Sequence, residues 1–250
     1  MNPVDQLEGD DETLDTFYHG RIHIFQTKKG YRFSIDAPLL ADFIQTKESD
    51  KILELGTGNG IISLLLSIKP FASLTALEIQ PSLADLARRN VRLNGCEGRI
   101  HVVHTDLRRF SVDQKFDVVF SNPPYIKQRT GQLSPSGEKS VAKHELKCTI
   151  FDIMQKTEEL LERSGVAYFI YPAMREEYFM RAMQKTHLKI KNIRCVSPQK
   201  GNDPNFFLVS CDYTSLEPRR LQPLILYEKQ GKYTKEAQEI FSGRIHDPAV

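Results

Sequence analysis

A tetrapeptide with an unusual set of functional groups lies near the middle of the chain, at Asn122-Pro123-Pro124-Tyr125. It follows the apolar run Phe116–Phe120, which predicts a buried strand, so these side chains are expected at the end of that strand. An amide oxygen, a backbone carbonyl stiffened by proline and an aromatic face can together hold a planar, weakly nucleophilic NH2 group. The pattern therefore predicts chemistry in which that nitrogen is presented to an electrophile.

A glycine-rich turn lies upstream, in the run Glu54-Leu55-Gly56-Thr57-Gly58-Asn59-Gly60. It follows a predicted strand and precedes a predicted helix, which is the context of a cofactor loop, and glycines allow close approach of backbone to ligand. The spacing is G-x-G-x-G, because position 61 is Ile, and so differs from the dinucleotide fingerprint. The shorter turn favours a nucleoside that carries a carboxylate.

Two acidic residues end the next predicted strands. Glu78 can accept the hydroxyl protons of a ribose, and Asp106 can accept the exocyclic amine of an adenine. The simpler alternatives are a solvated acid at Glu78 and an N-cap at Asp106. Taken with Glu54, Gly56, Gly58 and Gly60, these residues make S-adenosylmethionine (SAM) the preferred ligand.

The tetrapeptide predicts a mechanism based on orientation. The side-chain oxygen of Asn122 and the carbonyl of Pro123 are expected to accept the two N–H bonds of the amine and so direct its lone pair. Pro124 helps to hold these acceptors in place, and Tyr125 is expected to stack on the base, a contact worth roughly 1–3 kcal/mol. No general base is required. The alternative is a rigid turn that only caps the strand.

The bulk composition fits one α/β domain with short extensions. Of 250 residues, 40% are hydrophobic and 26% charged, and no window approaches the roughly 18 apolar residues that span a bilayer. The N-terminus is acidic and lacks the apolar core of a signal peptide, and the four cysteines are scattered without a CxxC pair. We expect a cytoplasmic protein with free thiols and no metal.

The net charge of +2 hides an asymmetry, because residues 1–15 contain six acids and no Lys or Arg. The remaining chain has 34 basic and 26 acidic residues, a net charge of +8. Such a body can attract a polyanion, although many enzymes with this much charge never contact nucleic acid.

Short apolar runs alternate with helical patterns from residue 50 onward. This predicts an α/β fold: a Rossmann-like, seven-stranded, mostly parallel sheet with helices on both faces. Strands are expected at Lys51–Leu55, Ser73–Glu78, Ile100–Val103, Phe116–Ser121, Val166–Tyr171, Ile190–Val196 and Phe206–Cys211. Helices are expected at Ile61–Ile68, Pro81–Leu93, Ile150–Arg163, with Gly165 as terminator, and Ala173–Lys185. The last two strands should form a C-terminal antiparallel hairpin.

Basic residues follow the tetrapeptide in a polar stretch that is expected to be a mobile flap. The candidate RNA contacts there are Lys127, Arg129, Lys139, Lys143 and His144. A second basic set without intervening acids is Lys185, Lys189, Lys191, Arg194 and Lys200, whereas Arg88, Arg89 and Arg92 are expected to form a solvated helix face. If RNA binds, affinity should fall steeply with salt. A merely solvated loop is the alternative.

With these motifs established, the chain resembles class I SAM-dependent methyltransferases of the small methyltransferase group. More narrowly, it is similar to the bacterial tRNA adenine-N6 methyltransferases that modify valine tRNA at the purine 3′ of the anticodon. Beyond the two motifs, the segments that carry the resemblance are Phe25-Gln26, Gly30–Ser34, Asp36 with Leu39–Ala41, His144-Glu145 and Gly231–Thr234. The resemblance implies methyl transfer from SAM to an adenine of tRNA. Nothing in the sequence indicates a membrane or an obligate protein partner.

Four segments are expected along the chain. They are an acidic, flexible arm (1–20), a small hairpin and helix (21–50), the methyltransferase domain (51–215) and a polar tail with one short helix at Lys235–Phe241 (216–250). The hairpin is expected between Arg21–Gln26 and Tyr31–Ser34, and Asp36 is expected to be the N-cap of the helix.

Other acceptors remain open, because Asn-Pro-Pro-Tyr holds an NH2 group and not the molecule that carries it. A protein glutamine-N5 methyltransferase would use the motif equally well, but such enzymes usually carry a helical domain ahead of the glycine motif, and only about fifty residues precede Gly56. A guanine-N2 methyltransferase of ribosomal RNA usually has a longer, duplicated chain. A non-enzymatic RNA-binding module is the alternative from another class, and equilibrium binding of SAM would separate it from the enzymes.

Overall fold

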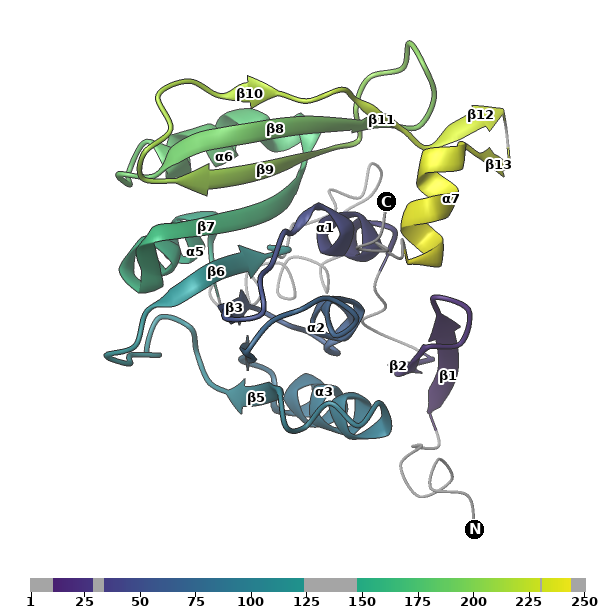
Figure 1. Ribbon diagram of the computed structural model, residues 1–250, viewed down its shortest axis with the longest axis vertical. Coiled ribbons are helices and arrows are strands. Elements are labelled where there is room, and N and C mark those ends of the chain that lie inside the picture. Colours follow the sequence, from purple (N-terminus) through teal and green to yellow (C-terminus); the bar gives the residue numbers. More distant parts are fainter. Residues whose placement is uncertain (1–10, 29–33, 124–147, 230, 244–250) are drawn as a thin grey trace, which may run out of the picture.

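A mixed β-sheet with helices on both faces is the centre of the computed structural model, which describes residues 11–28, 34–123, 148–229 and 231–243 (Figure 1). The strands of this sheet are β3 (Lys51–Leu55), β4 (Ser73–Glu78), β5 (Ile100–His104), β6 (Phe116–Ser121), β7 (Leu161–Pro172), β8 (Lys189–Ser197), β9 (Phe206–Asp212), β10 (Arg219–Arg220) and β11 (Leu224–Ile225). The helices are α1 (Asp36–Phe43), α2 (Ile61–Leu66), α3 (Pro81–Leu93), α5 (Ile150–Leu160), α6 (Glu176–Met183) and α7 (Lys235–Ser242), with a 3-10 turn, η2, at Ala173–Arg175. Two ribbons pair β1 (Glu12–Phe17) with β2 (Ile22–Thr27) and β12 (Tyr227–Lys229) with β13 (Lys232–Tyr233).

The strand order is β10-β8-β9-β7-β6-β3-β4-β5, with β11 also paired to β8, which makes nine strands in the described residues. Strands β3 to β7 are parallel, and β9 is antiparallel to both β7 and β8. The Rossmann-like α/β sheet, its seven long strands and its C-terminal hairpin are therefore confirmed. The additional strands β10 and β11 have two residues each, too few to form a sequence pattern.

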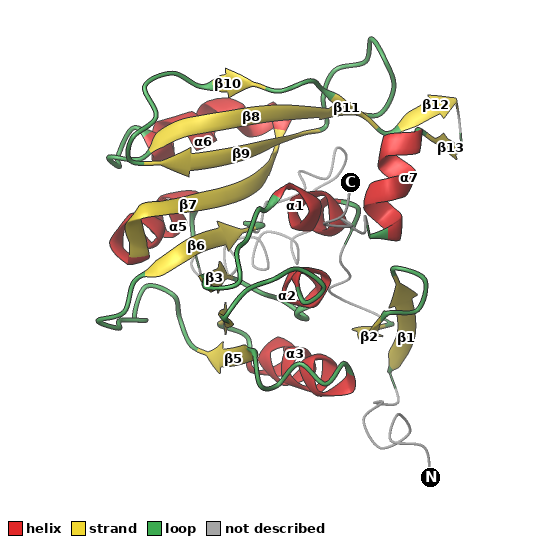
Figure 2. Ribbon diagram, viewed as in Figure 1, coloured by secondary structure: helices red, strands yellow, loops and turns green. Residues whose placement is uncertain are grey.

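Apolar residues on both faces of the strands explain the two helical layers (Figure 2). Ile52 of β3 packs in a core with α1, α2 and α7, whereas the next residue, Leu53, packs in a second core with α5 and α6. Successive strand side chains point to opposite faces, so a strand covered on both sides must be apolar throughout. The short apolar runs of the sequence follow from this arrangement.

The bounds of three helices differ from the prediction: α2 ends at Leu66, two residues before the expected end, and the other two differ for reasons visible in the structure. The helix that begins at Ile150 ends at Leu160, because Leu161 is extended and joins β7. Gly165 lies inside β7 and is not a helix terminator; a Cβ at this position would lie 2.8 Å from the carbonyl oxygen of Asp117 on β6, so the close approach of the strands requires glycine. The second helix, expected from Ala173, begins as η2 and continues as α6 only from Glu176.

The N-terminal hairpin lies one strand earlier than predicted. β2 pairs antiparallel with β1, which falls within the segment expected to be an acidic, flexible arm. The reason is a contact distant in sequence: Arg89 of α3 donates to both carboxylate oxygens of Glu12, at 2.7 and 2.5 Å. This ion pair also shows that Arg89 does not belong to a solvated face.

Side chains of α3 hold the opposite edge of β2. The amide of Asn90 accepts from the Phe25 N–H at 2.7 Å and donates to the Phe25 carbonyl at 3.0 Å. One helical turn later, Asn94 does the same with the N–H and carbonyl of His23, at 2.9 and 2.6 Å. Since Asn90 also donates to the carbonyl oxygen of Asn59 at 2.9 Å, it connects the hairpin to the glycine turn.

The predicted C-terminal helix is present as α7, with the Thr234 hydroxyl accepting from the N–H of Ala237. The start of α1 differs slightly from the prediction: Ile35 is the N-cap, and Asp36 is the first helical residue. The carboxylate of Asp36 points back to accept from the N–H of Ala37. Among the described residues, no helix is long and apolar enough to cross a membrane.

Candidate active site

The glycine turn connects β3 to α2, and no described residue packs beside its first glycine. Gly56, Gly58 and Gly60 have φ values of +83°, +60° and +88°, a region that glycine adopts without strain. The N–H groups of Gly56 and Thr57 both donate to the carbonyl of Leu77 on β4, which anchors the turn. A Cβ at Gly60 would lie 3.3 Å from that of Ala87 on α3, whereas no described atom lies within 4 Å of one at Gly56.

Glu54 holds this turn from within the protein. It is 1% exposed, and one of its carboxylate oxygens accepts from the hydroxyl of Thr57 at 2.6 Å and from the hydroxyl of Ser63. Burial raises the pKa of Glu54 to about 7, although both hydroxyls favour the charged form. Its bonds therefore stabilise the shape of the turn.

Glu78 lies at the end of β4 and contacts the same turn. One carboxylate oxygen accepts from the N–H of Gly58 at 2.9 Å, and the other accepts from the N–H of Gln80 at 2.9 Å. Burial raises the pKa of Glu78, and these N–H groups oppose that shift. Because an ionised carboxylate can accept about four hydrogen bonds, Glu78 has acceptor capacity left for a ligand hydroxyl.

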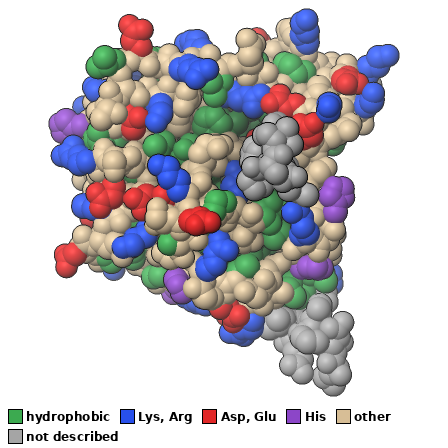
Figure 3. Space-filling model, in the orientation of Figure 1, with side chains coloured by type: hydrophobic (Ala, Val, Ile, Leu, Met, Phe, Trp, Pro, Cys, Tyr) green, Lys and Arg blue, Asp and Glu red, His purple; other side chains and the backbone are tan. Residues whose placement is uncertain are grey.

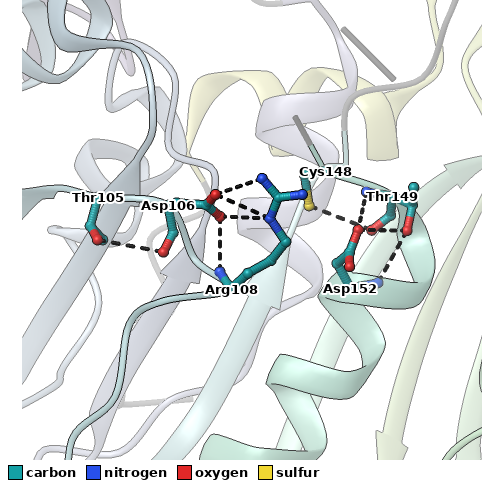
Figure 4. A network of polar contacts seen from close by, with 6 residues as sticks. All are labelled: Thr105, Asp106, Arg108, Cys148, Thr149 and Asp152. Atoms are coloured by element: carbon teal, nitrogen blue, oxygen red, sulfur yellow. Dashed lines mark hydrogen bonds and ion pairs between the residues drawn. The ribbon is translucent and has the colours of Figure 1, made fainter. Parts of the chain in front are cut away.

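Asp106 follows the neighbouring strand β5 and is engaged by Arg108, as Figure 4 shows. The Arg108 side chain donates to both carboxylate oxygens, at 2.6 to 3.1 Å, and its backbone N–H donates at 3.0 Å. These hydrogen bonds lower the pKa of Asp106. In the same view Arg108 lies between Asp106 and the start of α5, where Thr149 and Asp152 cap the helix.

Asn122 immediately follows β6, the neighbour of β3. The hydroxyl of Ser121 donates to the carbonyl of Leu55 at 2.6 Å, so the chain enters both motifs from strands that are hydrogen-bonded to each other. The side-chain nitrogen of Asn122 donates to Asp36 at 3.0 Å. Its side-chain oxygen is buried and accepts no hydrogen bond from any described residue. An unpaired buried acceptor costs about 1–3 kcal/mol, which a ligand N–H would recover.

The structure thus brings together Glu54, the glycines, Glu78 and Asn122, with Asp106 just after the strand adjacent to β4. Pro123 is buried at the end of the described segment. The other predicted residues of the motif and flap lie outside the described residues: Pro124, Tyr125, Lys127, Arg129, Lys139, Lys143 and His144. In the second basic set, Lys191 pairs with Asp212 at 3.4 Å and Arg194 with Glu236 at 2.7 Å. Figure 3 likewise shows acidic and basic side chains interspersed on the visible face.

Sequence reasoning missed several polar residues of this region. The sequence predicts Asp36 as an N-cap and as part of the family resemblance, and no motif includes Ser63, Asn90 or Arg108. Ser63 is nine residues from Glu54 and Asn90 is 31 from Asn59, so no short motif contains either pair. Arg108 is only two residues after Asp106, so its position in the sequence could have indicated this ion pair.

These residues fit the nucleoside and sulfonium amino acid of SAM. They are a glycine turn whose first glycine has no described atom beside it, an acid with spare acceptor capacity at the end of β4, another just after β5, and an acceptor that no described residue pairs. Strand order, glycine turn and strand-end acids together define a class I SAM-dependent methyltransferase. The chain belongs to the methyltransferase small domain family, whose model matches residues 31–167, more than half of its length.

The relatives of known name are similar over most of the chain. A tRNA1(Val) (adenine(37)-N6)-methyltransferase of Aliivibrio fischeri is 27% identical over 195 residues, 78% of this chain and 82% of that protein. The protein of the same name from a Flavobacteriaceae bacterium is 26% identical over 229 residues, 91% of this chain and 90% of that one.

Solved structures share the fold at lower identity. A predicted O-methyltransferase of Agrobacterium tumefaciens has a TM-score of 0.65 and 20% identity, and covers 83% of this chain and 96% of its own. Trm5 of Methanocaldococcus jannaschii, in complex with adenosine, has a TM-score of 0.57 and 17% identity, covering 83% of this chain and 57% of its own.

Proposed function

We propose that this protein methylates the exocyclic N6 amine of an adenine in tRNA, at the position 3′ of the anticodon of valine tRNA. The names of the relatives support the tRNA acceptor, since matches of this name extend over most of the chain. A tRNA substrate also supports the cytoplasmic location expected from the sequence. SAM, when bound, supplies the methyl group as a sulfonium.

The observation that carries the chemistry is the buried, unpaired side-chain oxygen of Asn122, one strand away from the glycine turn. The nitrogen of an aromatic amine is a poor nucleophile, because its lone pair is delocalised into the ring. In this proposal the Asn122 oxygen and the Pro123 carbonyl accept its two N–H bonds and orient the lone pair. Pro124 fixes the turn and Tyr125 stacks on the base, as the motif predicts.

The remaining site residues bind the cofactor in this proposal. Glu78 accepts the ribose hydroxyls while it retains its bond to Gly58. Asp106 accepts the adenine amine, and must share its carboxylate with Arg108 to do so. Gly56 allows the ligand to approach the turn, and Gly60 allows α3 to approach it. Glu54 holds the turn from within through its hydrogen bond with Thr57. The basic residues from Lys127 to His144 contact RNA phosphates.

The acceptor can be identified directly. The protein is incubated with isotope-labelled SAM and, separately, total tRNA, ribosomal RNA and cell protein, and the labelled product is digested and identified by mass spectrometry. The expected product is N6-methyladenosine in tRNA, located to one position by nuclease mapping. Labelled N5-methylglutamine or N2-methylguanosine would instead assign one of the alternative acceptors and contradict the proposal.

The salt dependence of substrate binding is a second test of which class of molecule accepts the methyl group. If phosphate contacts hold the substrate, the affinity for tRNA should fall steeply between 50 and 200 mM salt, by about 10³-fold or more for six contacts. SAM affinity, measured in the same buffers, is the control and should change little. A flat response for the macromolecular substrate would contradict an RNA acceptor.

A further inference from the structure

The side-chain amide of Asn122 has two ends of nearly equal shape but opposite hydrogen-bonding character. The nitrogen end donates to one carboxylate oxygen of Asp36, at 3.0 Å, across 86 residues of sequence. The oxygen end is buried and accepts no hydrogen bond from a described residue. Only this orientation offers an acceptor to an incoming amine; the reversed amide would present two N–H groups to another N–H donor.

Asp36 is itself held firmly. It is 4% exposed, and its second carboxylate oxygen accepts from the hydroxyl of Ser34 at 2.7 Å and from the N–H of Ala37 at 3.0 Å. Its negative charge lies in the first turn of α1, where the helix dipole favours an anion.

The other end of α1 is also fixed. Lys69 donates through its ammonium group to two carbonyls in the last turn of the helix, those of Ala41 and Asp42, and to that of the C-cap residue Ile44, at 2.6 to 3.0 Å. The helix is therefore restrained at both ends, and Asp36 has a defined position relative to β6.

We infer that Asp36 is a positioning residue that fixes the orientation of the Asn122 amide, so that its oxygen is always the group presented to the substrate amine. An ionised carboxylate has only acceptors, so it bonds the nitrogen end and repels the oxygen end. The inference rests on the proposed use of Asn122 as an acceptor for an NH2 group, but not on the identity of the molecule that carries it.

The substitution Asp36→Asn makes a sharp test, because the backbone determines how the introduced amide lies. The N–H of Ala37 can only donate, so the oxygen of the introduced amide should remain toward it. The NH2 group of that amide should then replace the carboxylate oxygen that faces Asn122. Two donors would face each other, and the Asn122 amide should reverse. Asp36→Ala, in contrast, removes the restraint without imposing the wrong orientation.

Asn resembles Asp more closely than Ala does, but Asp36→Asn is expected to be the less active of the two variants. Asp36→Asn should lower kcat by about 100-fold or more, the usual effect of removing one preorganised hydrogen bond to the reacting group. Asp36→Ala should lower it by less than 10-fold, although it should have the lower Tm. SAM affinity of Asp36→Asn should stay within twofold of wild type. If the role of Asp36 were purely structural, kcat would follow Tm, and Asp36→Ala would be the less active variant. The inference is overturned if Asp36→Asn is as active as Asp36→Ala or more active.

A matched control is Asp50→Asn, which makes the same change at another buried carboxylate. Asp50 is 8% exposed and accepts from the N–H of Lys47 at 2.8 Å, next to the start of β3, so the substitution should leave kcat unchanged. If Asp36→Ala fails to fold, the comparison of Asp36→Asn with Asp50→Asn decides: equal kcat values for the two overturn the inference.

A spectroscopic measurement makes the test independent of the acceptor. In nitrogen-15 NMR spectra of wild type with SAM bound, the side-chain NH2 signal of Asn122, assigned by its loss in Asn122→Ala, should shift on Asp36→Asn and be unchanged in Asp50→Asn. An unchanged signal in Asp36→Asn overturns the inference. If instead wild type methylates glutamine or guanine, the tRNA assignment fails, and the kcat comparison is made on that acceptor.

Discussion

The hydroxyl of Ser121 donates a buried hydrogen bond of 2.6 Å to the backbone carbonyl of Leu55. Ser121 is the last residue of β6 and precedes Asn122, and Leu55 is the last residue of β3 and precedes Gly56. One bond thus joins the strand end that carries the proposed amine-binding amide to the strand end that carries the glycine turn.

Ser121→Ala should destabilise the protein by about 1–2 kcal/mol, because it leaves the buried Leu55 carbonyl without this donor. It should also lower kcat more than it weakens SAM binding, since Asn122 is the next residue. Urea unfolding and steady-state kinetics measure the two effects. Ser67→Ala is the control: its hydroxyl also donates to a backbone carbonyl, that of Leu64, but within one helical turn of α2. Equal effects of the two substitutions would show that the junction has no special role.

Asn122→Ala should lower kcat by about 100- to 1,000-fold, as expected when a preorganised contact to the reacting group is removed. The equilibrium affinity for SAM, measured by titration calorimetry, should change less than twofold, because the cofactor contacts assigned to Glu78 and Asp106 remain. Turnover close to wild type would exclude the amide as the amine-binding group.

Glu78→Gln should weaken SAM binding by about 10-fold or more, because a charge-assisted hydrogen bond to the ribose contributes about 1.5–3 kcal/mol. The new amide must also place its NH2 group toward the N–H of either Gly58 or Gln80, so the Tm should fall. Affinities for S-adenosylhomocysteine and its 2′-deoxy analogue separate the two causes.

Wild type should bind S-adenosylhomocysteine more tightly than its 2′-deoxy analogue, and Glu78→Gln should bind the two with similar affinity. Glu97→Gln changes an exposed carboxylate that pairs with Arg92, and should behave like wild type in both assays. A retained ribose preference in Glu78→Gln would assign the diol contact to another residue.

The buried Glu54 predicts a specific pH dependence of stability. Its pKa is raised from 4.5 to about 7 by burial, so between these values the folded protein binds a proton that the unfolded chain has released. The free energy of unfolding therefore falls as pH rises through this window, by up to about 3 kcal/mol from this one group.

Glu54→Gln lacks this titration, while the other buried acids, Glu78 among them, are common to both proteins. Urea unfolding from pH 4.5 to 8.5 should show the wild-type stability declining relative to Glu54→Gln up to about pH 7 and running parallel above it. A difference that is constant with pH would mean that Glu54 has an ordinary pKa in the folded protein.

The fold was largely predictable because its strands carry local signals. The run Phe116–Ser121 is apolar on both faces and therefore indicates a central strand, and the Gly56–Gly60 spacing indicates the turn between strand and helix. The pairing of β3 with β6, which puts the glycine turn and Asn122 at the ends of neighbouring strands, comes from the structure.

The unpredicted features depend on contacts between distant residues. The acids of β1 have the composition of a solvated arm, and this segment is a strand because it pairs with β2 and because Arg89, 77 residues away, binds Glu12. The bond between Asp36 and Asn122 is likewise invisible to local patterns, as is the close approach to Asp117 that makes Gly165 part of a strand.

The hydrogen bonds from the side chains of Asn90 and Asn94 to β2 determine how well this protein should tolerate truncation at its N-terminus. Their amides give α3 the hydrogen-bonding character of a neighbouring strand, so β2 is paired on both edges. A shortened chain that begins after residue 28 would leave the side-chain amides of Asn90, which is fully buried, and Asn94 without their backbone partners in β2. The Asn90 amide, which also donates to the Asn59 carbonyl, would then keep only that hydrogen bond. The backbone amides of His23 and Phe25 should accordingly exchange with solvent as slowly as those of the central sheet, and removal of β2 should loosen the glycine turn.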